Sequence, residues 1–141
     1  SGFVVGDSDL IMDFARLRQY TGGASPGPIL AAATSLWKDE AHVKANRALY
    51  RDKFSDAEKI IGSHPHFYRP DGGFYLWLKV GDGEETARRL WASAGVKVMP
   101  GAYLSREGGN PPGAAYIRLA LVHDRSKTTE ALTRLATHIQ E

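Results

Sequence analysis

Apolar residues recur along most of the chain at intervals of three and four, which is the spacing of helices that bury one face. Local punctuation supports these helices. Asp7, Ser25, Asp82 and Asp124 are cap residues before such stretches, and Gly22, Gly62 and Gly95 follow the ends of three of the five stretches. The pattern predicts helices over 10–21, 26–37, 39–61, 83–94 and 125–139.

Period-two alternation predicts the strands. It is clearest over 74–80, where four apolar residues alternate with Tyr75, Trp77 and Lys79. Further strands are expected at 2–6, at 96–99 before Pro100-Gly101, and at 115–122. A surface loop rich in glycine and proline is expected at 106–113. The order of elements predicts an α/β fold of the α+β small-domain kind, with a small mixed or antiparallel sheet covered by helices.

Arg118 is the only charged residue in the strand expected at 115–122. A guanidinium does not lose its proton, and burying it unpaired costs several kcal/mol, so an anion should meet it. The anion is either a neighbouring Asp or Glu, or the carboxylate or phosphate of a ligand bound bidentately. Periodicity alone favours the internal ion pair.

Composition is ordinary for a globular domain, with 43% hydrophobic and 24% charged residues in 141. A net charge of +2, spread along the helices, gives no argument for nucleic acid. No cysteine is present, which excludes disulfides and thiolate chemistry and fits a reducing cytoplasm. No apolar stretch reaches the ~20 residues that a membrane helix needs.

Two short motifs have catalytic or metal-binding counterparts, and neither is supported by its surroundings. Ser35 and Lys38 form an S-x-x-K pattern, but the companion motifs of serine β-lactamases are absent and no P-G-x-R follows the lysine. His64 and His66 lack a nearby Cys, Asp or Glu to complete a metal site. We expect no metal ligands in the chain.

Six segments, in order and spacing, resemble the class I/II aminotransferases of fold type I, which depend on pyridoxal 5'-phosphate. The similarity covers essentially the whole chain, and the pattern is closest to bacterial succinyldiaminopimelate aminotransferases. The segments are 1–7 (SGFVVGD), 37–43 (WKDEAHV), 46–54 (NRALYRDKF), 73–77 (GFYLW), 98–104 (VMPGAYL) and 116–122 (YIRLALV).

The resemblance implies that Arg118 binds the α-carboxylate of the substrate, and it thereby favours the ligand over the internal ion pair. It implies transfer of an amino group between an amino acid and a 2-oxo acid, of the N-succinyl-LL-2,6-diaminopimelate:2-oxoglutarate type in lysine biosynthesis. Pro100-Gly101 would shape the edge of the pocket. The stretch from Thr21 to Pro28 resembles one that approaches the partner's active site in a homodimer, although Pro28 stands where relatives often carry glutamine.

The family's Schiff-base lysine and its cofactor-binding residues would precede Ser1. We therefore expect the chain to be a C-terminal fragment, made by proteolysis or cloning, that holds no cofactor, has no catalytic residue and is inactive alone. Its expected parts are a remnant of the large domain (1–38), an interdomain helix (39–62) and the small domain (63–141). The lysines, none of them in the family's lysine context, are at 38, 44, 53, 59, 79, 97 and 127.

Two other classes of function remain open. The chain could be a stand-alone α/β module in which Arg118 binds a carboxylate or another anion without catalysis. It could also be a protein-interaction domain in which Arg118 is paired internally with Asp or Glu. The state of the Arg118 guanidinium distinguishes this last class from the other two.

Overall fold

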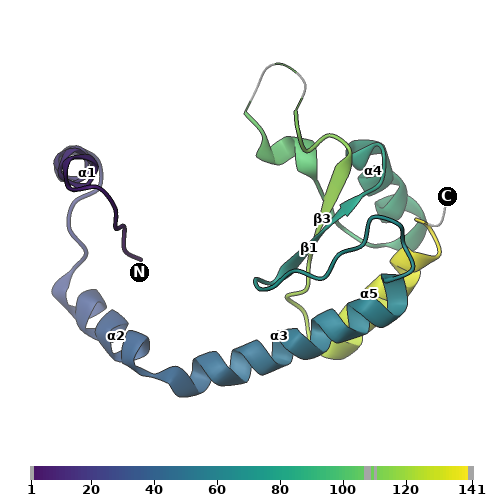
Figure 1. Ribbon diagram of the computed structural model, residues 1–141, viewed down its shortest axis with the longest axis horizontal. Helices are drawn as coiled ribbons and strands as arrows, with labels where there is room; N and C mark the ends of the chain where they lie inside the picture. The colour runs from purple at the N-terminus through teal and green to yellow at the C-terminus, as the bar shows by residue number, and fades with distance from the viewer. Residues whose placement is uncertain (1, 107–108, 110, 140–141) are drawn as a thin grey trace. The chain divides into compact units, whose positions relative to one another are not determined.

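The computed structural model describes residues 2–106, 109 and 111–139. Contacts between residues divide the chain into two compact units, unit 1 over residues 1–45 and unit 2 over residues 46–141. Figure 1 shows the helices and strands of both. No described helix is long and apolar enough to cross a membrane.

Unit 1 contains α1 (Ser8–Thr21), α2 (Gly27–Lys38) and the start of α3 (Glu40–Ile61). Asp7 caps α1 by accepting from the backbone N–H groups of Asp9 and Leu10, as the sequence predicts, and Gly22 follows its last turn. The start predicted for α2 is wrong in detail, because Pro26 occupies the cap position and Pro28 the first turn. No residue of α1 or α2 is buried.

The strand predicted at residues 2–6 is wrong, since these residues form no strand. A strand needs a neighbour to bond its backbone, and the described part of unit 1 contains no strand. Phe3 instead packs its ring against Trp37, with the ring centroids 5.3 Å apart and the planes at 66°. A side-chain contact within unit 1 thus replaces the expected pairing.

Unit 2 is built on a three-stranded antiparallel sheet, which confirms the predicted fold class. The strands are β1 (Tyr75–Lys79), β2 (Met99–Pro100) and β3 (Tyr116–Ala120), in the order β1-β3-β2. Each is shorter than the sequence predicted. The longer pairing joins all five residues of β3 to β1, whereas β2 pairs with β3 only at Met99 and Pro100.

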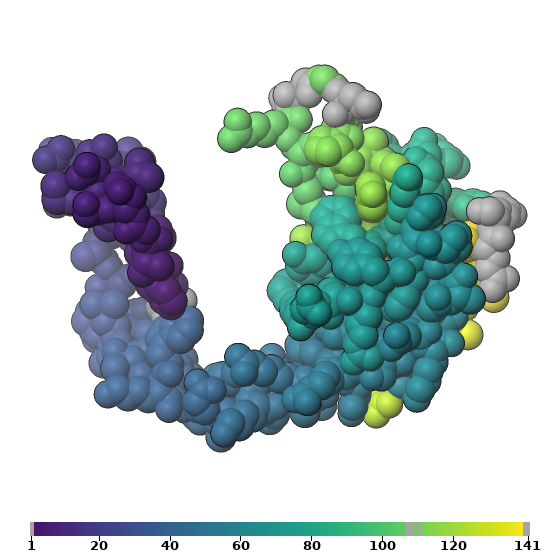
Figure 2. Space-filling model, viewed as in Figure 1, coloured from purple at the N-terminus to yellow at the C-terminus, as the bar shows by residue number. Residues whose placement is uncertain are grey.

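Helices cover one face of this sheet. They are the later turns of α3, α4 (Gly83–Ala94) and α5 (Arg125–Ala136), and the short helix η1 (Gly101–Leu104) follows β2. Figure 2 shows the teal and yellow segments of unit 2, distant in sequence, gathered in one body. The buried core comprises Phe54, Ala57, Ile61, Leu76, Leu78, Leu90, Val96, Ile117, Leu119, Leu121, Leu132, Leu135 and Ile139.

The ends of α4 and α5 follow the local sequence. Asp82 accepts from the N–H groups of Glu84 and Glu85 at 3.0 and 2.9 Å, and Gly95 ends α4 in the left-handed region at φ 64°. Asp124 caps α5 through the N–H of Lys127 at 2.9 Å. Because these signals act within one helical turn, the sequence predicts them well.

Candidate functional site: the open face of the sheet

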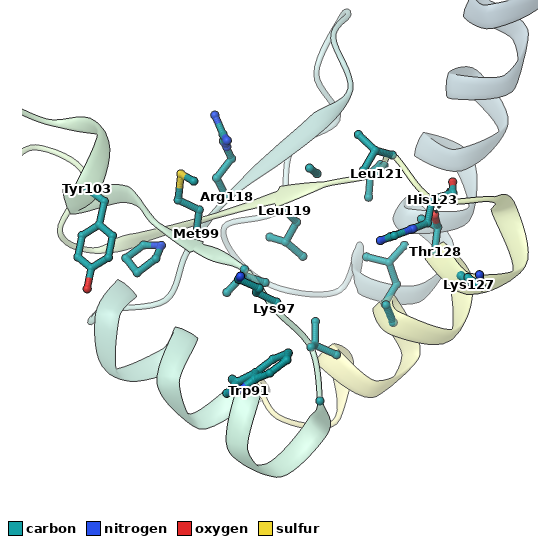
Figure 3. Close-up of a pocket in the computed structure, with 18 residues that line it drawn as sticks. Trp91, Lys97, Met99, Tyr103, Arg118, Leu119, Leu121, His123, Lys127 and Thr128 are labelled. Atoms are coloured by element: carbon teal, nitrogen blue, oxygen red, sulfur yellow. Dashed lines mark hydrogen bonds between the residues drawn. The ribbon is translucent and has the colours of Figure 1, made fainter.

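The face of the sheet opposite the helices carries Arg118. Along β1 and β3 the residues alternate between buried and partly exposed, with Leu76, Leu78, Ile117 and Leu119 facing the core. Arg118 therefore projects from the other face, and Figure 3 shows it leaving β3 on the side opposite Leu119. The β3 strand is thus buried on one face only.

Arg118 occupies a central position on this face. It lies opposite Trp77 of β1 and opposite Met99 of β2. Its guanidinium carbon lies over the ring of Tyr75, 5.4 Å from the centroid. The side chain is half-buried rather than buried, so water can still hydrate the charge and the burial penalty is smaller than the sequence suggested.

The Arg118 guanidinium makes no ion pair or hydrogen bond to another described residue, unlike four other arginines of unit 2, which are Arg69, Arg88, Arg125 and Arg134. Arg125 binds Asp56 through two nitrogens at 2.5 and 2.8 Å, and Arg69 binds Glu58 at 2.9 Å. The internal ion pair that periodicity alone favoured is therefore absent from the described part of the chain. This arrangement leaves a fixed cation whose N–H groups can accept an anion.

A pocket of about 680 Å³ lies at the β2 edge of the sheet and reaches to the helix side; it is lined by residues 95–100, residues 118–123 and helices α4 and α5. Its walls are mainly apolar. Its charged lining residues are Lys97, Arg118 and Lys127, and His123 also lines it. No aspartate or glutamate belongs to the lining. The combination of apolar walls and positive charge suits an organic anion.

The turn at Pro100-Gly101 forms one end of this region. Pro100 lines the pocket, and Gly101 is buried. A Cβ on Gly101 would lie 2.4 Å from the carbonyl oxygen of Gly113 and 2.8 Å from the Trp77 ring. Only glycine allows this close approach of the two backbone segments. The neighbouring Tyr103 donates to Glu84 at 3.1 Å, which raises the pKa of the Tyr103 phenol above its ordinary value of 10.0.

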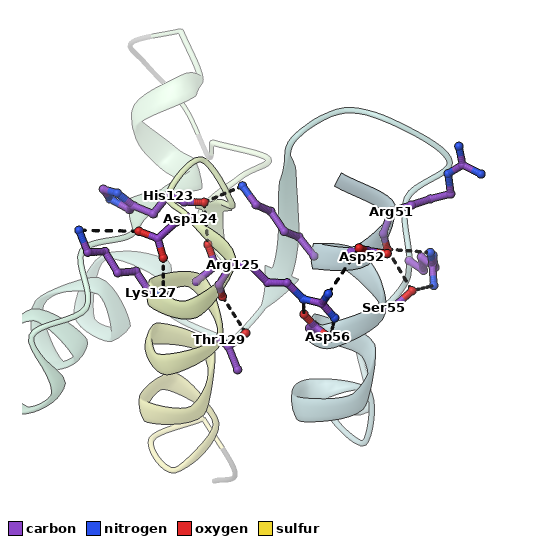
Figure 4. Close-up of polar contacts among 12 residues, drawn as sticks. Arg51, Asp52, Ser55, Asp56, His123, Asp124, Arg125, Lys127 and Thr129 are labelled. Atoms are coloured by element: carbon purple, nitrogen blue, oxygen red, sulfur yellow. Dashed lines mark hydrogen bonds and ion pairs between the residues drawn. The ribbon is translucent and has the colours of Figure 1, made fainter. Parts of the chain in front are cut away.

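Lys53 is a residue that the sequence analysis did not single out. It is 9% exposed, and its Nζ donates to the carbonyl oxygens of Leu121 and His123 at 2.8 and 2.6 Å. Figure 4 shows His123, one of these two acceptors, and the contact of Arg125 with Asp56 of α3. These contacts hold the chain immediately after β3, the strand that carries Arg118.

The other sequence motifs lie outside the open face. The hydroxyl of Ser35 donates to the carbonyl of Ala31 at 3.3 Å within α2, and no interaction joins it to Lys38 among the described residues. The rings of His64 and His66 are 6.0 Å apart, and partial burial lowers the pKa of His64 below 6.5. The described residues include no group of three or more His, Cys, Asp or Glu placed to hold a metal ion.

Comparison with known proteins gives relatives of one kind. An aminotransferase from Neisseria meningitidis Z2491 superposes with a TM-score of 0.85 and 38% identity, over 99% of this chain and 36% of that one. The chain has the fold of part of an aminotransferase. A probable aminotransferase of Mycobacterium tuberculosis is 29% identical over 96% of this chain and 31% of its own length. An LL-diaminopimelate aminotransferase of Syntrophobacter fumaroxidans is 28% identical over 95% of this chain and 34% of its own length.

The chain spans about a third of the length of the curated relatives it matches. No protein-family model matches it. The similarity covers both units of the chain. The resemblance to aminotransferases noted in the sequence is therefore matched by a similarity of fold. The sequence pattern was closest to succinyldiaminopimelate aminotransferases, but neither of these two curated relatives is named for that substrate. One is named for LL-diaminopimelate instead.

Proposed function

We propose that this chain is the C-terminal portion of a pyridoxal-phosphate-dependent aminotransferase, in which Arg118 binds the α-carboxylate of the substrates. The observation that carries the proposal is the Arg118 guanidinium, held at the centre of an open sheet face without an ion pair to any described residue. Similarity to aminotransferases over nearly the whole chain supports the reaction class.

Arg118 is suited to a positioning role in this reaction. Both substrates of a transamination, the amino acid and the 2-oxo acid, carry a carboxylate on the carbon that reacts. A planar guanidinium binds that carboxylate with two parallel N–H···O bonds and so fixes the orientation of the adjacent carbon. One arginine can therefore orient the substrates of both half-reactions, and it exchanges no proton itself.

We propose that the described residues of this chain do not themselves hold pyridoxal phosphate. Lys53, the buried lysine, already donates to two backbone carbonyls. Lys97 and Lys127 line the pocket, but no acid lines it to pair with the pyridine nitrogen. We propose that the rest of the protein supplies the cofactor site, with residues 1–38 in the large domain, 39–62 as the interdomain helix and 63–141 as the small domain.

We infer that the amino donor is N-succinyl-LL-2,6-diaminopimelate, with 2-oxoglutarate as acceptor, in a homodimeric cytoplasmic enzyme of lysine biosynthesis. The ordered sequence segments described above support this donor. Relatives named for LL-diaminopimelate support a diaminopimelate skeleton without the succinyl group. The two donors share the α-carboxylate that Arg118 would bind and differ at the distal nitrogen.

The test is a transaminase assay on the protein as its gene encodes it, supplied with pyridoxal phosphate and 2-oxoglutarate. We expect glutamate to form with N-succinyl-LL-diaminopimelate faster than with LL-diaminopimelate. The reverse preference would retain the reaction class and overturn the donor. If no amino acid yields glutamate while carboxylates still bind saturably, the protein is instead a carboxylate-binding module.

A further inference from the structure

The side chain of Tyr75 contacts the Arg118 guanidinium through its ring. Its ring lies under the guanidinium, with the guanidinium carbon 5.4 Å from the ring centroid, and both residues project from the open face of the sheet. A guanidinium over an aromatic face is attracted by the negative potential of the ring. Tyr75 therefore attracts the cation through its ring, whereas an acid would bind it through hydrogen bonds.

The Tyr75 ring is itself held by neighbouring aromatic rings. Phe74 meets it edge-on, with centroids 5.2 Å apart and planes at 90°, and Trp77 meets it at 6.5 Å and 86°. Trp77 in turn contacts Tyr116 of β3 at 6.2 Å and 82°. Such edge-to-face contacts restrict the rings to defined orientations. The surface under Arg118 is thus a fixed row of aromatic side chains across two strands.

This geometry has a consequence for anion binding. The five N–H groups of a guanidinium lie in its plane, and a carboxylate approaches along that plane. An internal Asp or Glu would occupy these groups with hydrogen bonds, whereas attraction by an aromatic ring does not require them. The aromatic contact therefore orients the cation without competing for its hydrogen bonds.

We propose that Tyr75 is a positioning residue for Arg118: its ring restrains the guanidinium and leaves the N–H groups for the substrate carboxylate. The proposal rests on the function proposed above. It assigns to Tyr75 an effect on substrate binding that passes entirely through Arg118. The aromatic ring carries the effect, and the phenolic hydroxyl has no part in it.

The test compares Tyr75→Leu and Tyr75→Phe in the complete pyridoxal-phosphate-loaded protein, with Tyr68→Leu as the control for loss of an exposed tyrosine elsewhere in unit 2. We expect Tyr75→Leu to raise KM for the amino acid about fivefold, with a smaller change in kcat, because one cation–π contact is lost. Tyr75→Phe and Tyr68→Leu should leave KM within about twofold.

A double-mutant cycle separates positioning from a structural role. In an Arg118→Gln background, Tyr75→Leu should not raise KM further, since the cation on which it acts is gone. The same increase in both backgrounds, or an equal increase in Tyr75→Phe, overturns the proposal. If Arg118→Gln alone leaves KM unchanged, the proposed carboxylate role of Arg118 fails instead. Should Tyr75→Leu unfold, Tyr75→Met, which also lacks the ring, replaces it in both backgrounds with the same expected outcomes.

Discussion

The two faces of the three-stranded sheet use alternate residues of the same strands for different purposes. The inner face carries Leu76, Leu78, Ile117 and Leu119, all 6% exposed or less. The outer face carries the aromatic row and Arg118, all of them partly exposed. A shift of one residue in register would exchange the two sets, so the buried leucines also determine where Arg118 points.

Because the two faces use different residues, we expect substitutions within one strand to change either stability or binding, depending on the face. Removing volume from the inner face should lower the free energy of unfolding and leave the chemistry of the folded molecules intact. Changing charge or geometry on the outer face should impair substrate binding and leave the free energy of unfolding nearly unchanged. The variants below test this division.

The largest effect on stability is expected from Leu78→Ala. Leu78 is 1% exposed in the core, so its truncation should lower the free energy of unfolding by about 2–5 kcal/mol. Hydrogen exchange of the β1 and β3 amides in the complete protein measures this change. Lys79→Ala, next along β1 and exposed, is the control and should change it by less than about 0.5 kcal/mol. Equal losses in both variants would contradict the division between faces.

Arg118→Lys is the corresponding change on the outer face. It keeps the charge but loses the planar pair of N–H donors, so kcat/KM should fall by an amount equivalent to ~2–4 kcal/mol. Protection of the β1 and β3 amides should stay close to that of the unaltered protein. An unchanged kcat/KM would remove Arg118 from substrate binding, and loss of amide protection would give it a structural role.

Local and non-local interactions explain what the sequence could predict. The caps at Asp82 and Asp124 and the glycine at 95 act within a helical turn. The local sequence was therefore enough to predict where these helices begin and where α4 ends. The strand at 2–6 was predicted from its local sequence alone, yet a strand depends on a neighbour that the local sequence does not reveal. The fold class followed from the order of the elements, which confirms the value of that signal.

The site was predictable only in part. The sequence singled out Arg118 as a lone charge in an apolar strand, but whether an acid would pair with it depended on the register of β1 against β3. The contact with Tyr75 joins residues 43 positions apart in the chain, and that of Lys53 with Leu121 joins residues 68 apart. A tyrosine two positions before Trp77, on the same face of β1, was the available signal for the aromatic row.

Lys53→Met tests the connection between α3 and the end of β3. Methionine keeps the apolar stem but leaves the carbonyl of Leu121 without this donor, so the free energy of unfolding should fall by about 1–3 kcal/mol. Hydrogen exchange of the β3 amides provides the measurement. Lys59→Met, exposed on the same helix, should have little effect. Equal protection in the Lys53 and Lys59 variants would show that the buried amine is dispensable.

The smallest effect is expected from Asp56→Asn, which removes the acid bound by Arg125. The Arg125 guanidinium lowers the pKa of Asp56 below 3.8, so the pair stabilises the fold above that pH and the contribution is lost as the pH falls through the folded-state pKa. Arg125 is more than half exposed, which limits the gain. The melting temperatures of the two proteins should differ slightly at pH 7 and converge in acid. A difference that persists or grows in acid would contradict the ion pair as its source.

The preference for an amino acid over the same compound without its α-carboxylate tests the role of Arg118 most directly. The ratio of kcat/KM for the two compounds is measured in the complete protein and in Arg118→Gln. We predict that the substitution reduces this ratio by about 10²-fold or more, because only the carboxylate-bearing substrate loses its partner. A ratio that is the same in both proteins would show that the carboxylate binds elsewhere.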